Sequence, residues 1–165
     1  MPAAVFRYFW LVFIAVMLVN ASIWRHRLRR LEALGGVSRV EADQFLRGAV
    51  IAIVAFALAL QLIIILSGLS DPLCLLSEPM TAPAVLANTA IVAVAWALLL
   101  WWVWMGHGAQ TLARLGPALF TRGPVTKREY SAPIVRAVVT GVVTLSLVGS
   151  LIARLGVFAQ PPNGC

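Results

Sequence analysis

Four long apolar segments constrain this chain more than any other feature of its sequence. They lie at about residues 3–24, 46–68, 83–105 and 133–158, and none of them contains an aspartate or a glutamate. A helix that rises about 1.5 Å per residue needs about 20 such residues to cross a hydrocarbon layer about 30 Å thick. Because 61% of the residues are hydrophobic and only 12% are charged, the chain cannot give this apolar surface a water-soluble exterior. We therefore predict an all-α polytopic membrane protein, with residues 1–165 forming one domain of four transmembrane helices.

The first apolar segment shares one feature with a secretory signal, since Arg7 lies at its start. Its apolar part is longer than the core of a signal peptide, and WRHRLRR follows it in place of a small-residue cleavage site. We expect this segment to be retained as a membrane span.

The distribution of basic residues predicts the orientation of the spans. Of the 13 lysines and arginines, 11 lie within residues 25–47 and 106–136, whereas the loop between the second and third spans contains Asp71 and Glu78 and no base. The positive-inside rule then predicts an up-down-up-down antiparallel bundle with both basic connections in the cytoplasm and both termini outside. The expected location is a bacterial-type inner membrane. The net charge of +7 follows from this topology and favours contact with anionic lipid head groups, so we expect no nucleic-acid partner.

The first basic connection carries helix signals on both sides of a short turn. Leucines recur at a spacing of three until the Gly-Gly pair at 35–36 ends the helix, and Ser38 with Glu41 forms a capping box that starts the next one. We predict a long helical hairpin that projects into the cytoplasm. Its surface arginines either dock a partner or are solvated without one; the candidate docking residues are Arg27, Arg29 and Arg30.

The second basic connection has a weaker helix signal. A short amphipathic stretch covers residues 109–115 and is broken by the Gly-Pro pair at 116–117. Leu115, Leu119 and Phe120 lie among basic residues, a pattern typical of a helix that rests on the surface of the inner leaflet.

Tryptophans mark the predicted cytoplasmic ends of the first and third spans, where indole rings favour the head-group level. They are Trp24, Trp101, Trp102 and Trp104. His26 and His107 therefore lie at one depth on two spans, where a pair of imidazoles is able to ligate a haem, another pigment or a metal. The alternative is that both are interfacial polar residues without a ligand. We favour no cofactor, because no further ligand with suitable spacing accompanies them on that side.

Polar residues inside the spans are few, and they carry no negative charge. A proton-coupled carrier normally needs an ionisable group in the membrane, so this absence argues against one. The residues that remain as candidates to line a polar path are Asn20, Gln61, Asn88, Thr140 and Thr144. Gln61 and Asn88 are expected at nearly the same depth, either as an interhelical hydrogen bond or as the lining of a cavity.

Both cysteines are predicted to lie outside the membrane, on the oxidising side. Cys74 is in the outer loop and Cys165 is the last residue. A disulfide between them is the structural hypothesis. A redox-active pair is disfavoured, because the spacing is wide and the nearby charges are acidic.

Three classes of function follow from these features. Small residues are spaced by four at Gly48 and Ala52 and again at Ala137 and Gly141, which allows close contact with a neighbouring helix. Together with the basic hairpin they favour a non-catalytic subunit or scaffold of a larger membrane assembly. A homo-oligomeric channel or facilitator is the alternative, and a redox subunit with a haem or pigment is a third. The sequence contains no phosphate-binding, metalloprotease or nucleophile-elbow motif, so catalysis is the less favoured class.

Overall fold

The computed structural model describes residues 9–69, 75, 81–120, 125 and 130–154. These residues form five helices: α2 (Phe9–Ala33), α3 (Arg39–Leu66), α5 (Pro83–Trp104), α6 (Gly108–Leu119) and α7 (Ala132–Arg154). All but α6 are long and apolar enough to cross a membrane. The prediction of an all-helical chain with four candidate spans is confirmed.

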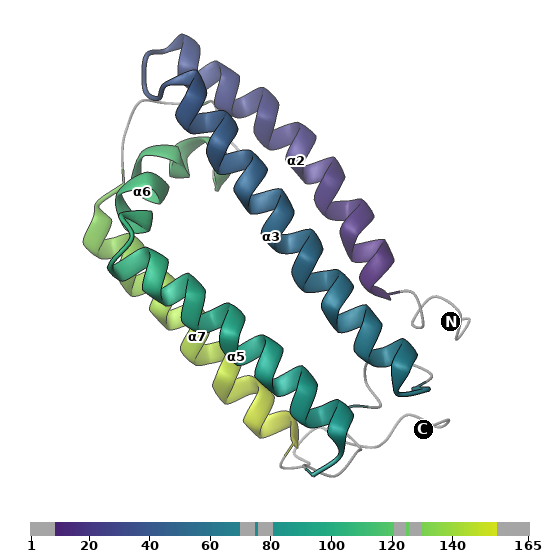
Figure 1. The fold of residues 1–165 in the computed structure, drawn as a ribbon. Helices are drawn as coiled ribbons and strands as arrows, with labels where there is room; N and C mark the ends of the chain where they lie inside the picture. The colour runs from purple at the N-terminus through teal and green to yellow at the C-terminus, as the bar shows by residue number, and fades with distance from the viewer. Residues whose placement is uncertain (1–8, 70–74, 76–80, 121–124, 126–129, 155–165) are drawn as a thin grey trace.

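The long helices form two pairs (Figure 1). α2 and α3 run along each other in opposite directions, α5 lies beside α7, and the short helix α6 lies between the pairs at one end. We call the end of the molecule that contains the α2–α3 turn (residues 34–38) and α6 the basic end. In the apolar windows of α2, α5 and α7 only 6% of the residues are buried, against 28% for α3. The long helices therefore leave most of their apolar side chains facing outward.

The turn between α2 and α3 forms as its sequence predicts. Gly35 adopts a left-handed φ of 70°, and the Gly36 N–H donates to the Leu31 carbonyl at 3.0 Å, which closes the last turn of α2. Ser38 then caps α3, its hydroxyl accepting the Glu41 N–H at 3.2 Å. α3 has 28 residues and so a length of about 42 Å, which is about 12 Å more than a hydrocarbon core requires.

α6 differs from the sequence prediction in its length. It continues through Gly116 and Pro117 to Leu119, where we had expected a break. Pro117 has no N–H for the Ala113 carbonyl, and the Tyr130 N–H donates to that carbonyl at 3.0 Å instead. A Cβ on residue 116 would overlap the Tyr130 ring, so glycine is needed there for Tyr130 to approach. A contact from outside the helix thus satisfies the group that the proline leaves unpaired.

The apolar face of α6 also differs from expectation, because it packs against protein. Leu115 is 0% exposed and forms a core with Leu28 and Leu31 of α2 and with Ala42 of α3. The sequence had predicted that this face rests on the inner leaflet. An amphipathic pattern identifies an apolar face but not its partner, and here the partner is the α2–α3 hairpin.

A second core joins the two pairs at the basic end. Val103 of α5 packs with Ala109 of α6, and the rings of Phe45 and Trp102 stack with centroids 6.4 Å apart. Gly108 lies against the Trp102 indole, where an added Cβ would be 2.7 Å from Cε3. The corner between α5 and α6 therefore depends on a glycine beneath a tryptophan.

Candidate functional site at the basic end

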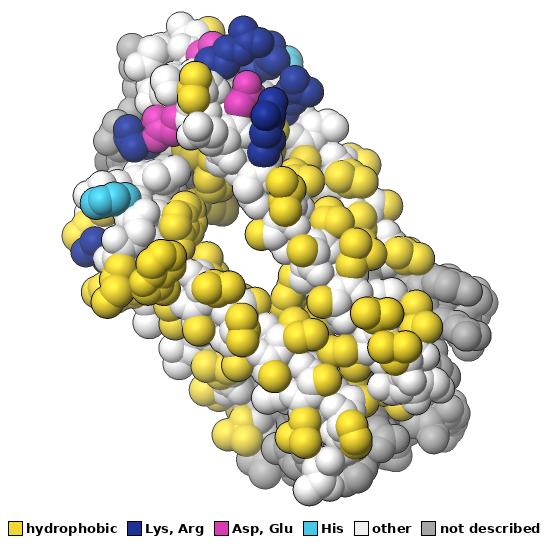
Figure 2. Space-filling view, viewed as in Figure 1, with side chains coloured by type: hydrophobic (Ala, Val, Ile, Leu, Met, Phe, Trp, Pro, Cys, Tyr) yellow, Lys and Arg dark blue, Asp and Glu magenta, His cyan; other side chains and the backbone are white. Residues whose placement is uncertain are grey.

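The basic end carries most of the charged side chains of the described chain (Figure 2). Arg29 and Arg30, two of the predicted docking residues, are exposed on α2, whereas Arg27 is half-buried. The other exposed arginines at this end are Arg25, Arg39, Arg47 and Arg114. This end is thus a positively charged surface suited to anionic groups.

An ion pair joins two helices of this end. Arg114 Nη2 of α6 lies 2.7 Å from Glu41 Oε1 of α3. The capping-box pattern had placed Glu41 in the first turn of α3, and its carboxylate reaches across to α6. Both side chains are partly exposed, so the pair contributes about 0.2–1 kcal/mol. It orients α6 more than it stabilises the fold.

Below the basic end the two helical pairs separate. Figure 2 shows an opening through the molecule between the α2–α3 pair and the α5–α7 pair. On α3, Ala42 and Leu60 lie five turns apart on one face and are 6% and 3% exposed. Ile53 lies between them on the same face and is only half-buried. This face is therefore covered at both ends and open in the middle, within the apolar part of the helices.

Small residues of α3 face outward. Gly48, Ala52 and Ala55 share one helical face, and all three are exposed. A Cβ added at Gly48 would meet nothing within 4 Å, and the same holds at Gly141 of α7. The close helix contacts that the sequence predicted at Gly48 and Gly141 are therefore not made within this chain.

The tryptophans at the end of α5 have three different environments. Trp102 faces inward onto Phe45, whereas Trp101 is 60% exposed. Trp104 Nε1 donates to Thr140 Oγ1 at 3.3 Å, and the Arg136 guanidinium lies 5.3 Å from the Trp104 ring centroid. The sequence predicted three interfacial rings, but one of them is part of the core.

His26 lies on α2 and His107 lies in the corner between α5 and α6, and both are exposed. His107 precedes α6 with a left-handed φ of 61°. His26 is on α2 about 160° around the axis from Leu28, the residue that packs on α6. Figure 2 accordingly shows histidine side chains at two separate places on this face. This arrangement adds no support to the prediction that His26 and His107 ligate one haem or pigment. Among the described residues, no three His, Cys, Asp or Glu side chains are grouped to hold a metal ion.

The predicted polar span residues are spread over four helices. Gln61 is buried and 4% exposed, Asn20 and Asn88 are half-buried, and Thr144 is exposed. Thr140 accepts the hydrogen bond from Trp104. The channel alternative that rests on these residues stays a prediction.

Several hydroxyl groups in the spans are bonded within their own helix. Thr89 Oγ1 donates to the Val85 carbonyl at 2.7 Å, and Ser150 Oγ donates to the Ser146 carbonyl at 2.8 Å. Such bonds to the preceding turn satisfy a hydroxyl without water. They suit helices surrounded by lipid. The predicted Cys74–Cys165 disulfide lies outside the described residues.

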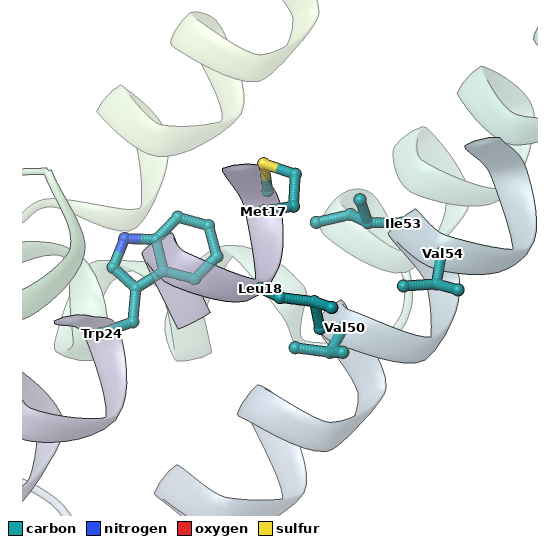
Figure 3. Close-up of a pocket in the computed structure, with 6 residues that line it drawn as sticks. All are labelled: Met17, Leu18, Trp24, Val50, Ile53 and Val54. Atoms are coloured by element: carbon teal, nitrogen blue, oxygen red, sulfur yellow. The ribbon is translucent and has the colours of Figure 1, made fainter. Parts of the chain in front are cut away.

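A hollow on the seam between α2 and α3 was not anticipated from the sequence (Figure 3). It is shallow and encloses no cavity, since its empty space of about 200 Å³ includes the open space outside it. Its lining is apolar and consists of Met17, Leu18, Trp24, Val50, Ile53 and Val54. Hydropathy marks these residues only as membrane-spanning, and the hollow depends on how the two helices pack.

Comparison of the chain with protein-family models, curated proteins and solved structures found no match.

Proposed function

We propose that this chain is a non-catalytic integral membrane subunit, which serves as a scaffold in a larger membrane assembly. The observation that carries the proposal is the opening between the two helical pairs (Figure 2). A chain that works alone in lipid is expected to close its helices around one another through van der Waals packing. Here the pairs are joined at the basic end by the Phe45–Trp102 stack and the α6 core. A transmembrane helix of another protein is the occupant that suits the apolar space between them.

The outward small-residue face of α3 supports the same proposal. Gly48, Ala52 and Ala55 leave the backbone of α3 accessible to a neighbouring helix. Close backbone approach is the main source of helix association in membranes, where lipid tails are as apolar as leucine. A partner helix is therefore expected to contact α3 along this face.

Co-purification tests the proposal. We expect the tagged protein, extracted from its native membrane in mild detergent, to elute with other membrane polypeptides. The variant Ala52→Leu puts bulk on the small-residue face and is expected to release the partner. Leu58→Trp is the matched control, because it adds bulk at an exposed position about 120° around α3 from Ala52. Elution of the wild-type protein as a lone monomer contradicts the proposal, as does equal loss of partner in both variants.

We also propose that the chain crosses the membrane four times with both termini outside. The charge bias supports this orientation, because exposed arginines gather at the α2–α3 turn. A membrane-impermeant thiol reagent is expected to label Cys74 and Cys165 on intact, reduced cells or spheroplasts. Labelling only after permeabilisation contradicts the orientation.

A further inference from the structure

The shallow hollow between α2 and α3 has an apolar lining suited to contact with a hydrocarbon chain. Met17 and Ile53 point toward one another across it, and the Leu18 side chain lies beside Val50 (Figure 3). None of the six lining residues is charged or carries a hydroxyl or amide group. Because the hollow is shallow and open, a chain of the surrounding lipid is able to lie along it. An acyl chain fits this chemistry, but apolar lining alone does not select one lipid from another.

Two arginines near the hollow favour a lipid with an anionic head group. Arg25 follows Leu18 by seven residues on α2, and Arg47 precedes Val54 by seven residues on α3. Seven residues are two turns of helix, so each arginine lies about 20° around the axis from its hollow-lining residue and about 10 Å along it. Both displacements run toward the basic end. Each helix therefore carries a positive charge directly above the apolar hollow.

The two arginines also lie at the same depth. Arg25 is eight residues from the end of α2 at Ala33, and Arg47 is eight residues from the start of α3 at Arg39. Both side chains are exposed, and the ion pair of Arg114 with Glu41 involves neither of them. Trp24 lies next to Arg25, in the hollow lining. A phosphate between the two guanidinium groups would meet two donors at head-group level.

We propose that this seam binds an anionic phospholipid of the leaflet at the basic end. Its phosphate lies between Arg25 and Arg47, and one acyl chain lies in the hollow between α2 and α3. The inference does not depend on a protein partner, because lipid binding is measured on the purified chain alone. The hollow and the α3 face between Ala42 and Leu60 share one residue, Ile53.

Native mass spectrometry of the detergent-purified, delipidated protein tests this site. We expect one phosphatidylglycerol molecule to bind more tightly than phosphatidylcholine with the same acyl chains. The double variant Arg25→Gln/Arg47→Gln is expected to weaken phosphatidylglycerol binding about 25-fold, since each basic residue near a membrane contributes roughly fivefold. Its binding of phosphatidylcholine should not change. The matched control Arg29→Gln/Arg30→Gln removes the same charge from exposed positions of α2 nearer the turn, and should keep the wild-type preference.

A second variant separates the site from a folding effect. Val54→Trp fills the hollow and leaves every charge in place, so it is expected to reduce phosphatidylglycerol binding at least as strongly. Phosphatidylglycerol carrying bromine on its acyl chains is expected to quench Trp24, measured as the difference between the wild-type protein and Trp24→Phe. Equal affinity for the two lipids overturns the proposal. So does equal weakening by the control pair, or wild-type binding by Val54→Trp.

Discussion

Replacing Leu115 by alanine tests whether α6 is held by protein packing. Leu115 is fully buried against Leu28, Leu31 and Ala42, so its removal leaves a cavity in a core at the basic end. Buried Leu→Ala changes cost about 2–5 kcal/mol, the transfer term plus the cavity term. If α6 opens as a unit, its amide hydrogens should exchange roughly 30-fold to 4,000-fold faster, because each 1.4 kcal/mol or so changes the opening equilibrium about tenfold.

Hydrogen exchange followed by mass spectrometry measures this effect on the peptide that covers α6. Leu34→Ala is the control, because Leu34 is 43% exposed at the end of the same hairpin and its truncation should change exchange little. An α6 resting on a leaflet loses only part of its lipid contact when Leu115 is shortened. Exchange in Leu115→Ala no faster than in Leu34→Ala would therefore refute the packing argument.

Three further changes probe contacts at the same end. Glu41→Gln removes the ion pair with Arg114. We expect the free energy of unfolding to fall by about 0.2–1 kcal/mol, and by less in high salt. A fall in thermal stability that does not depend on salt contradicts an electrostatic origin. Gly116→Ala forces a methyl group into the Tyr130 ring and is expected to lower the free energy of unfolding by about 1–3 kcal/mol. The double variant with Tyr130→Ala should lose less than the sum of the two single variants. Additive losses in this double-mutant cycle argue against the contact. His107→Asn places at this left-handed φ the residue that adopts it most readily after glycine, and should raise the free energy of unfolding by less than about 1 kcal/mol. A lower melting temperature indicates instead that the imidazole has a structural or ligand role.

The membrane spans were predictable because their cause is local. Few water-soluble folds can bury a run of about 20 apolar residues, so such a run indicates a membrane span without reference to the rest of the chain. The turn at Gly35 and the cap at Ser38 were predictable for the same reason, since a left-handed backbone and an unpaired helix N–H are satisfied by neighbouring residues.

The candidate sites were less predictable, because they depend on which faces meet. Gly48 and Gly141 have the spacing of close helix contacts, yet each faces open space in this chain. Spacing defines a face that is able to pack closely but does not identify its neighbour. Trp102 likewise matches an interfacial residue by position. Its stacking partner Phe45 lies 57 residues earlier in the chain, so the contact depends on where α3 is placed.

By itself the sequence determined the four long helices, their apolar character and the sign of charge at each turn, since these follow from backbone hydrogen bonding and transfer into lipid. Only the tertiary structure decided that α6 docks on α2 and α3 and that the two pairs separate below it. It also decided that Arg25 and Arg47 lie at one depth above a shared hollow. Hydropathy does not distinguish one apolar face from another, so which faces contact each other depends on their shapes and on the lengths of the connections between helices.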